Sequence, residues 1–225
     1  LYTESHPGFT GRVTVPLLWD DSNSLIVSND SALIMRALDR IDQRRFSLVP
    51  GHLVDRIDSL NAYIHTGLAN AVYRAGLAQA QSAHDEAIAD VFATLAALEK
   101  RLSRSRYLLG DAMCEADLRL FATLVRFDAV YVTHFRCTRH RLTDYPNLWA
   151  YARDIYAWPG VYATVSFDAI LDGYYRNDGW HNPHGIIPER PAADWTIPSG
   201  RSRVGPACLW TADGQLLSAP IEDDQ

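Results

Sequence analysis

The chain has 225 residues, which is long for one compact domain and short for two. Because 48% of its residues are hydrophobic and 21% are charged, it can bury a sizeable core and is not a disordered chain. Its 21 basic and 27 acidic residues give a net charge of −6, which excludes a broad basic surface for nucleic acid and suits a soluble protein. No segment approaches the ~18 uninterrupted apolar residues of a membrane span.

The first five residues lack the charged segment and the apolar segment of a signal peptide, so they do not form one. They also lack an initiator Met, so we expect more of the protein upstream. The three cysteines, Cys114, Cys137 and Cys208, are odd in number and widely spaced. This spacing argues against a disulfide scaffold and a four-cysteine metal site, and it fits a reducing cytoplasm. Cys137 and His140 have no second ligand pair at useful spacing, so we expect no metal.

The first forty residues predict two strands and a helix. Residues 13–19 form a β-rich run that ends at a polar turn, and residues 25–27 form a second short strand. Residues 28–31 have the composition of a helix cap. The helix after them carries on one face Leu33, Ile34, Ala37, Leu38 and Ile41. Because a lone hairpin is only marginally stable in water, this unit needs further strands from elsewhere.

After a polar linker at 42–52 the pattern is helical. We predict helices at about 54–80, 82–102, 115–133, 147–157 and 162–172. The third is apolar nearly all round and is therefore expected at the centre of the bundle. Residues 176–225 are rich in Pro and Gly, without periodicity, and predict an extended tail that is partly disordered at its end. The sequence therefore predicts an α+β protein in which a β-β-α unit precedes an all-helical domain.

Two short segments each allow a structural and a functional interpretation. A proline in an apolar strand, as at Val15-Pro16, indicates an edge strand, or a cis-proline that turns the backbone of Val15 toward an extended peptide ligand. Asp30 and Ser31 are ordinary caps, or they form a clamp in which the helix start holds a carboxylate and Asp30 pairs with an amine. A ligand with both groups is an amino acid or a γ-glutamyl peptide.

Tyrosines on helices, such as Tyr73 and Tyr174, usually pack half-buried with a bonded hydroxyl. Gly67 and Gly76 inside one predicted helix indicate a closely approaching backbone or ligand. Cys114 begins the central helix with the spacing of a capping box, and we interpret it as structural. From the residues alone, the chain is a small-molecule binding protein with a peptide-like ligand.

Several segments together resemble a known family. TVPLLWD (14–20) and IVSNDS (26–31) resemble the second half of the thioredoxin-like domain of glutathione transferases. A more specific resemblance, to the xi class or glutathionyl-hydroquinone reductases, lies in AVYRAG (71–76), EADLRLF (115–121), RFDAVYVTHFRC (126–137), DYPNLW (144–149), Tyr174-Tyr175 and NPHGIIP (182–188). The similarity covers roughly residues 6–190, and residues 191–225 have no match.

The resemblance implies that the backbone of Val15, before a cis Pro16, pairs with the cysteinyl part of glutathione, and that Asp30 and Ser31 hold its γ-glutamyl end. Tyr73 would donate a hydrogen bond to the hydroquinone oxygen as negative charge develops there. Tyr174 would do the same. In the family, a cysteine thiolate attacks the sulfur of a glutathionyl-hydroquinone, becomes a mixed disulfide, and is released by a second glutathione.

Three positions depart from the family pattern. The family nucleophile lies in a Cys-Pro-Trp-Ala motif upstream of this chain. Asp30 stands where the family has Glu, and Cys114 replaces the usual Thr cap. The resemblance further implies a cytoplasmic homodimer that uses glutathione as co-substrate, with no metal, nucleic acid or membrane as partner. The alternatives are a non-catalytic glutathione-binding or dimerisation module and a conventional glutathione transferase that activates glutathione through Ser or Tyr.

The domain boundaries follow from both lines of reasoning. We expect residues 1–45 to form the C-terminal half of a thioredoxin-like glutathione-binding domain. Residues 46–175 form the helical domain, and residues 176–225 form the tail.

Overall fold

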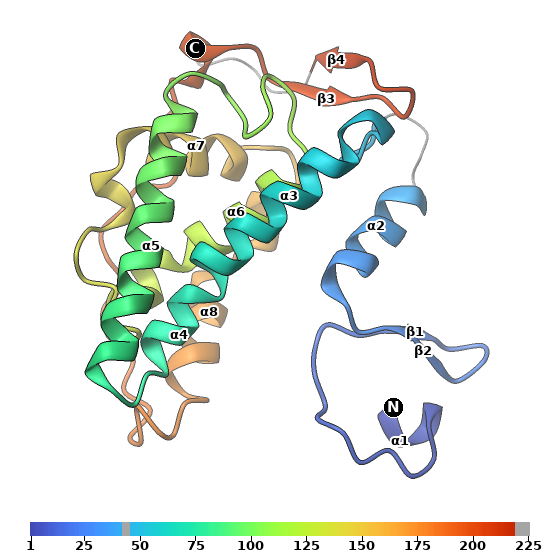
Figure 1. Ribbon diagram of the computed structural model, residues 1–225, viewed down its shortest axis with the longest axis vertical. Coiled ribbons are helices and arrows are strands. Elements are labelled where there is room, and N and C mark those ends of the chain that lie inside the picture. The colour runs from blue at the N-terminus through green and yellow to red at the C-terminus, as the bar shows by residue number, and fades with distance from the viewer. Residues whose placement is uncertain (42–45, 219–225) are drawn as a thin grey trace.

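The computed structural model describes residues 1–41 and 46–218 and has two lobes (Figure 1). The smaller lobe contains α1 (Tyr2–Ser5), the antiparallel strands β1 (Leu18–Asp20) and β2 (Leu25–Ser28), and α2 (Ser31–Ile41). Within the pair, Trp19 lies opposite Ile26. The predicted β-β-α unit is confirmed, but the strand predicted at 13–19 begins only at Leu18. Residues 13–17 pair with no strand in the described chain, so they lack the ladder that defines a strand.

The larger lobe is an all-helical bundle (Figure 1). Its main elements are α3 (Val54–Ile64), α4 (Ala71–Gly76), α5 (Gln81–Leu102), α6 (Glu115–Arg126), α7 (Pro146–Tyr156) and α8 (Phe167–Tyr175). Two helices predicted as continuous are interrupted by π-helical turns, at His65–Ala69 and Phe127–Tyr131. Short 3-10 turns occur at Gly51–Leu53, Leu142–Asp144 and Tyr162–Thr164. The α+β class with an all-helical second part is as predicted.

The apolar stripe predicted for α5 is buried, except that Ile88 is only partly so. It packs in the core with Leu60, Leu68, Leu120 and Leu148, which are at most 7% exposed. The prediction that the central helix is apolar nearly all round is wrong for α6. Its buried side faces the core, whereas Ala122 is exposed and Arg119 and Arg126 are half-buried on the opposite side. An amphipathic helix with one solvent-accessible face can contribute to a site.

The region after α8 differs from the unstructured tail that the sequence predicts. It contains a 3-10 turn at Arg201–Val204 and an antiparallel hairpin of β3 (Cys208–Trp210) and β4 (Leu216–Ser218), red in Figure 1. Cys208 is buried, and its backbone pairs with Asp111 and Met113 just before α6. Asp213-Gly214, with Gly214 at φ +83, forms the turn. The expected disorder at the chain end concerns residues 219–225, which lie outside the described residues.

Buried arginines attach this region to the bundle. Arg106 forms a two-bonded ion pair with Asp154 at 2.9 and 3.1 Å, and both side chains are at most 3% exposed. Arg201, fully buried, donates to the carbonyl oxygens of Leu102, Arg106 and other residues near the end of α5. Since the last carbonyls of a helix lack intrahelical partners, Arg201 satisfies groups that would otherwise be buried without a bond.

The predicted linker at 42–52 is described only from residue 46. There Ser47 bonds to Asp39 and bridges to Trp210 of β3, so the hairpin contacts the segment that joins the two lobes. Within residues 1–41 and 46–218, no helix is long and apolar enough to cross a membrane.

Candidate active site

Three tyrosine hydroxyls meet where α4, the turn after α6, and α8 come together. The hydroxyl of Tyr73 lies 2.5 Å from that of Tyr174, and the hydroxyl of Tyr131 lies 3.0 Å from that of Tyr174. Tyr73 is 38% exposed, Tyr174 is half-buried and Tyr131 is 3% exposed, so the cluster runs from the surface into the core. We call Tyr73, Tyr131 and Tyr174 the tyrosine cluster. It brings together the two predicted tyrosines, and their role stays a prediction.

Aromatic packing holds the cluster. Phe135 stacks on Tyr131 with ring centroids 5.5 Å apart and meets Tyr73 edge-on at 5.2 Å. A Cβ at Gly76 would lie 2.3 Å from the Phe135 ring, so only glycine fits there. A Cβ added at Gly67 would likewise lie 2.3 Å from the hydroxyl oxygen of Thr94. The expectation of a close backbone or ligand at these glycines is therefore wrong, because side chains occupy both spaces.

Burial makes the inner hydroxyls weak acids. It raises the pKa of Tyr174 to about 12. Desolvation also raises the pKa of Tyr131, with the neighbouring tyrosines adding to the effect. At neutral pH both hydroxyls are protonated, so the cluster can donate a hydrogen bond toward an oxygen placed beside it.

The other predicted site residues lie in the smaller lobe. The Val15-Pro16 bond is cis, and Val15 is 87% exposed with its backbone in no strand pair. A carboxylate oxygen of Asp30 accepts bonds from the backbone N–H groups of Ala32 (2.8 Å) and Leu33 (3.0 Å). These bonds, with the charge of Arg119, lower the pKa of the Asp30 carboxyl. Asp30 therefore caps α2 through one carboxylate oxygen. Its second oxygen and the exposed Ser31 lie beside it at the start of the same helix.

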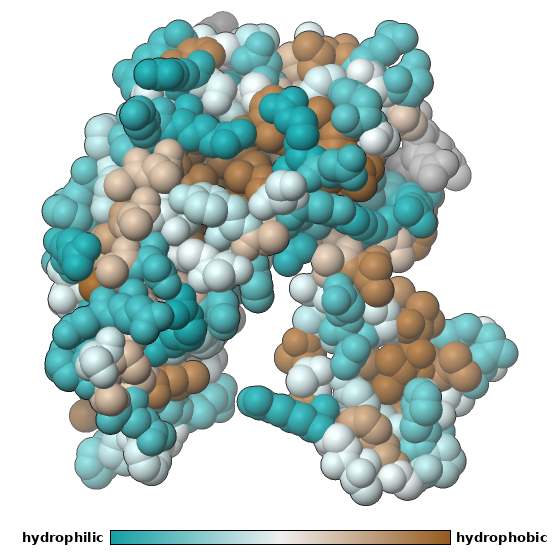
Figure 2. Space-filling model, viewed as in Figure 1, coloured by the Kyte–Doolittle hydropathy of each residue, from teal (hydrophilic) through white to brown (hydrophobic). Residues whose placement is uncertain are grey.

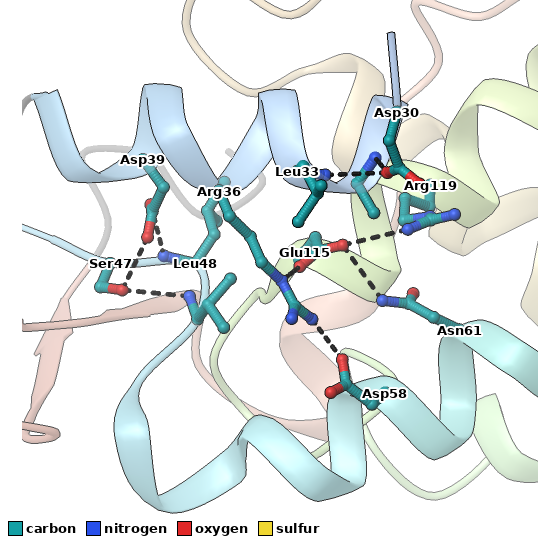
Figure 3. A network of polar contacts seen from close by, with 12 residues as sticks. Asp30, Leu33, Arg36, Asp39, Ser47, Leu48, Asp58, Asn61, Glu115 and Arg119 are labelled. Carbon is teal, nitrogen blue, oxygen red and sulfur yellow. Dashed lines mark hydrogen bonds and ion pairs between the residues drawn. The ribbon is translucent and has the colours of Figure 1, made fainter. Parts of the chain in front are cut away.

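A buried carboxylate connects the two lobes (Figure 3). Glu115, at the start of α6 and 1% exposed, accepts from Arg36 of α2 at 2.9 Å. It also accepts from Asn61 at 3.1 Å and Arg119 at 3.2 Å. Arg36 is also paired with the more exposed Asp58. Its hydrogen bonds to Asp58 and Glu115 raise the pKa of Arg36, so the cation that crosses between the lobes is permanent.

The exposed side of α6 extends from Asp30, at the start of α2, to the tyrosine cluster. Arg119 lies beside Asp30 (Figure 3), and the charge of Arg126 acts on Tyr174. Seven residues are about two turns, so the two arginines share a face and lie about 10 Å apart along the axis. The helix thus presents a cationic face between the start of α2 and the tyrosine cluster.

The described cysteines do not form a reactive site. All three are buried, and none of them forms a disulfide. Desolvation raises the pKa of Cys137 to about 12 and also raises that of Cys114, whose thiol donates to Asp117 at 3.1 Å. The prediction that Cys114 is structural agrees with this position. In the described parts of the chain there is also no group of three or more His, Cys, Asp or Glu side chains that could hold a metal ion.

Comparison with known proteins places this geometry in a family. Residues 81–154 match the family described as glutathione S-transferase, C-terminal domain. The chain is 49% identical over 205 residues to the glutathionyl-hydroquinone reductase YqjG of Escherichia coli, covering 89% of this chain and 62% of that protein. It is 48% identical to the glutathione-bound structure of YqjG, with a TM-score of 0.86 and coverage of 89% and 67%. The xi glutathione transferase structure from Phanerochaete chrysosporium is 37% identical, with a TM-score of 0.83 and coverage of 88% and 69%.

The chain belongs to the xi class of glutathione transferases. The β-β-α unit is thus part of a thioredoxin-like domain, and the bundle is the all-helical domain of this fold. The xi-class chain spans about 62% of the length of the curated relative with which it is 49% identical.

Sequence reasoning missed three site features. Tyr131 lies in the run 126–137, and its spacing from Phe127 and Phe135 places three aromatics on one helical face. Arg119 and Arg126 are seven residues apart on one predicted helix, a spacing that predicts a shared face. The pairing of Glu115 with Arg36, 79 positions apart, had no local signal.

Proposed function

We propose that the whole protein reduces glutathionyl-hydroquinones to hydroquinones with glutathione as co-substrate. The observation that carries the proposal is the tyrosine cluster, in which the hydroxyls of Tyr73 and Tyr131 both lie within 3.0 Å of that of Tyr174, at one end of the cationic face of α6. Protonated hydroxyls at such a point suit a substrate oxygen that gains negative charge in the transition state. The similarity to a glutathionyl-hydroquinone reductase supports the same reaction.

Glutathione is the ligand that we propose for the smaller lobe. Its γ-glutamyl end would lie at Asp30 and Ser31, where Asp30 receives the ammonium group and the start of α2 receives the carboxylate. The free backbone groups of Val15, before Pro16, would pair with the cysteinyl unit. An extended tripeptide spans about 10 Å, which matches the length of α6 between the two ends of the site. The related YqjG structure is described as glutathione-bound.

The proposed reaction has two steps. A cysteine thiolate attacks the sulfur of the glutathionyl-hydroquinone, the sulfur–ring bond breaks, and the ring carbon takes a proton. The hydroquinone leaves, and the enzyme holds glutathione as a mixed disulfide. A second glutathione thiolate attacks that disulfide, which restores the enzyme thiolate and releases glutathione disulfide. Tyr73 and Tyr174 donate hydrogen bonds to the ring oxygen during the first step.

The nucleophile in this proposal is a cysteine outside the present chain. Cys114, Cys137 and Cys208 are buried, and high pKa values keep the thiols of Cys114 and Cys137 protonated. We therefore expect Ala variants of each to retain turnover in the whole protein. A loss of turnover in a folded variant would place the nucleophile in this chain.

Further parts of the proposal concern the assembly. We propose that residues 1–45 belong to the thioredoxin-like domain, 46–175 to the helical domain and 176–225 to the tail. We also propose that the protein is a homodimer and that it is cytoplasmic. The boundary at 42–45 falls outside the described residues. Sedimentation and fractionation test the last two statements directly.

The test of the reaction compares tyrosines. In the whole protein, Tyr73→Phe and Tyr174→Phe should each lower kcat for glutathionyl-menadiol by about 100-fold, since a hydroxyl aimed at developing charge is removed. Tyr63→Phe is the matched control, because Tyr63 is 45% exposed on α3 and outside the cluster. Unchanged kcat in the double variant Tyr73→Phe/Tyr174→Phe would refute the proposed chemistry.

The second candidate is a non-catalytic glutathione-binding module, which the burial of all three cysteines favours. Calorimetry separates it from the reductase. Asp30→Asn keeps a good helix cap but removes the charge, so it should weaken glutathione binding in either case. Asp20→Asn, at the end of β1 where the carboxylate accepts from Asn23, should not. Glutathione binding without turnover in the whole protein would establish the module.

A further inference from the structure

A cavity of about 760 Å³ lies between α6, α8 and the segment 159–166, with Tyr174 in its wall. We call it the α6–α8 cavity. Its size is within the range of about 300–1,000 Å³ that small-molecule sites occupy. Most of its lining is apolar and includes Leu118, Val125, Val165 and Ile170.

Small residues keep this cavity open. Ala122 on α6 and Ala169 and Gly173 on α8 line it. A Cβ added at Gly173 would meet no atom within 4 Å. Glycine in a helix costs about 1 kcal/mol relative to alanine. None of the described neighbours requires a glycine at position 173. The missing side chain leaves space next to Tyr174.

The charge of the lining is one-sided. Arg126 contributes a guanidinium group, and no Asp or Glu lines the cavity, although the protein carries a net charge of −6. Across residues 1–41 and 46–218, Arg126 has no carboxylate partner, and its bond runs to the carbonyl oxygen of Ala122. A half-buried cation beside an apolar surface favours a ligand that is apolar and also anionic.

We propose that the α6–α8 cavity binds a flat apolar group that bears an acidic substituent, with Arg126 holding the anion. Because Tyr174 belongs both to the cavity wall and to the tyrosine cluster, a substrate ring at the hydroxyls can extend a substituent into the cavity. The class of substrate is then a hydroquinone conjugate whose ring carries an apolar, acidic side group. This identification rests on the proposed function, whereas binding to the cavity does not.

The binding test uses two fluorescent probes on the whole protein. They are 8-anilinonaphthalene-1-sulfonate and N-phenyl-1-naphthylamine, which share a ring system and differ by the sulfonate. Arg126→Gln should weaken binding of the sulfonate probe about 10-fold, since a charge-assisted bond is lost, and leave the neutral probe unchanged. Arg176→Gln is the control, because Arg176 is an exposed cation just after α8 that pairs with Asp172 instead.

A second pair of variants localises the site. Gly173→Leu should weaken the binding of both probes by obstructing the part of the cavity beside Tyr174, while Gly173→Ala, which also removes the helical cost of glycine, should retain both. In turnover, Gly173→Leu should lower kcat/KM for a conjugate with a large acidic substituent more than for glutathionyl-menadiol. Equal loss of both probes in Arg126→Gln, or full binding in Gly173→Leu, would overturn the inference.

The probe experiment and the turnover experiment fail independently. If the probe pattern holds and the whole protein lacks reductase activity, the cavity is a ligand site and the proposed function is wrong. If glutathionyl-menadiol is reduced and the Arg126 and Gly173 variants bind both probes as the parent does, the proposed function stands and the cavity inference is wrong.

Discussion

The helical bundle and the β-β-α unit bury apolar residues to very different extents. In the bundle, residues such as Leu95, Leu124 and Tyr151 have no exposed surface. In the β-β-α unit, Ile34 alone among the described apolar side chains counts as buried, at 9% exposure. Figure 2 shows apolar side chains gathered on the surface of the smaller lobe and an open hollow between the lobes.

The two regions therefore differ in what stabilises them. The bundle has its own core, whereas the unit is held by polar contacts such as Arg36 with Glu115 and leaves Val27 and Leu33 58% and 60% exposed. The tyrosine cluster lies in the bundle with the large core, and Asp30 lies in the unit with little buried apolar surface. The position of the unit is then set by the contacts between the lobes. Each prediction below tests one part of this contrast.

The largest expected effect comes from a buried charge in the bundle. Asp154→Asn removes the buried carboxylate that pairs with Arg106, close to the buried Arg201, and should lower the free energy of unfolding by about 3–5 kcal/mol. Asp20→Asn, at the end of β1 in the smaller lobe, should change it by no more than about 0.5 kcal/mol. Urea unfolding of both variants measures the difference, and equal effects would show that the tail is not anchored at Asp154.

Apolar truncation should follow the same contrast. Leu95→Ala creates a cavity in the core and should cost about 2–5 kcal/mol. Leu33→Ala, on the exposed face of α2, should cost at most about 0.5 kcal/mol in this chain. A comparable loss for Leu33→Ala would mean that another surface buries α2 in solution.

The contact between the lobes should have an intermediate effect. Glu115→Gln removes the charge that Arg36 and Arg119 share, and should weaken the attachment of α2 by about 1–3 kcal/mol. Hydrogen exchange should become faster in residues 31–41 but not in α5. Asp58→Asn, which affects a more exposed partner of Arg36, should cost no more than about 1 kcal/mol. Faster exchange throughout the bundle would contradict a local role.

Alkaline pH should act gradually on the bundle through Cys137. Burial raises its pKa from 9.0 to about 12, so the unfolded thiol loses its proton first. Cys137 therefore contributes its full share to the free energy of unfolding below about pH 9. That share falls by about 1.4 kcal/mol per pH unit as the pH rises toward 12. Unfolding curves at pH 8 and 10 should therefore differ less in Cys137→Ala than in the parent. The same slope in both proteins would contradict this assignment.

Much of the fold could be predicted from the sequence, because helices in this chain are specified by local periodicity. The second predicted helix, 82–102, corresponds to α5 at Gln81–Leu102, and the central helix begins at Glu115 as predicted. The hairpin at 208–218 was missed although Asp213-Gly214 between two apolar runs is a turn signal. The π-helical turns had no such signal, since they depend on how neighbouring helices pack.

The sequence by itself determined the order of elements, the apolar stripe of the bundle, and the family to which the residues of the site belong. These properties depend on local spacing and on long identical runs. The tertiary structure alone decided that Tyr131 joins Tyr73 and Tyr174, that Glu115 links the lobes, and that a cavity opens beside Arg126. Each of these joins side chains from different elements, and their distances depend on how the helices cross, which no local pattern in the sequence encodes.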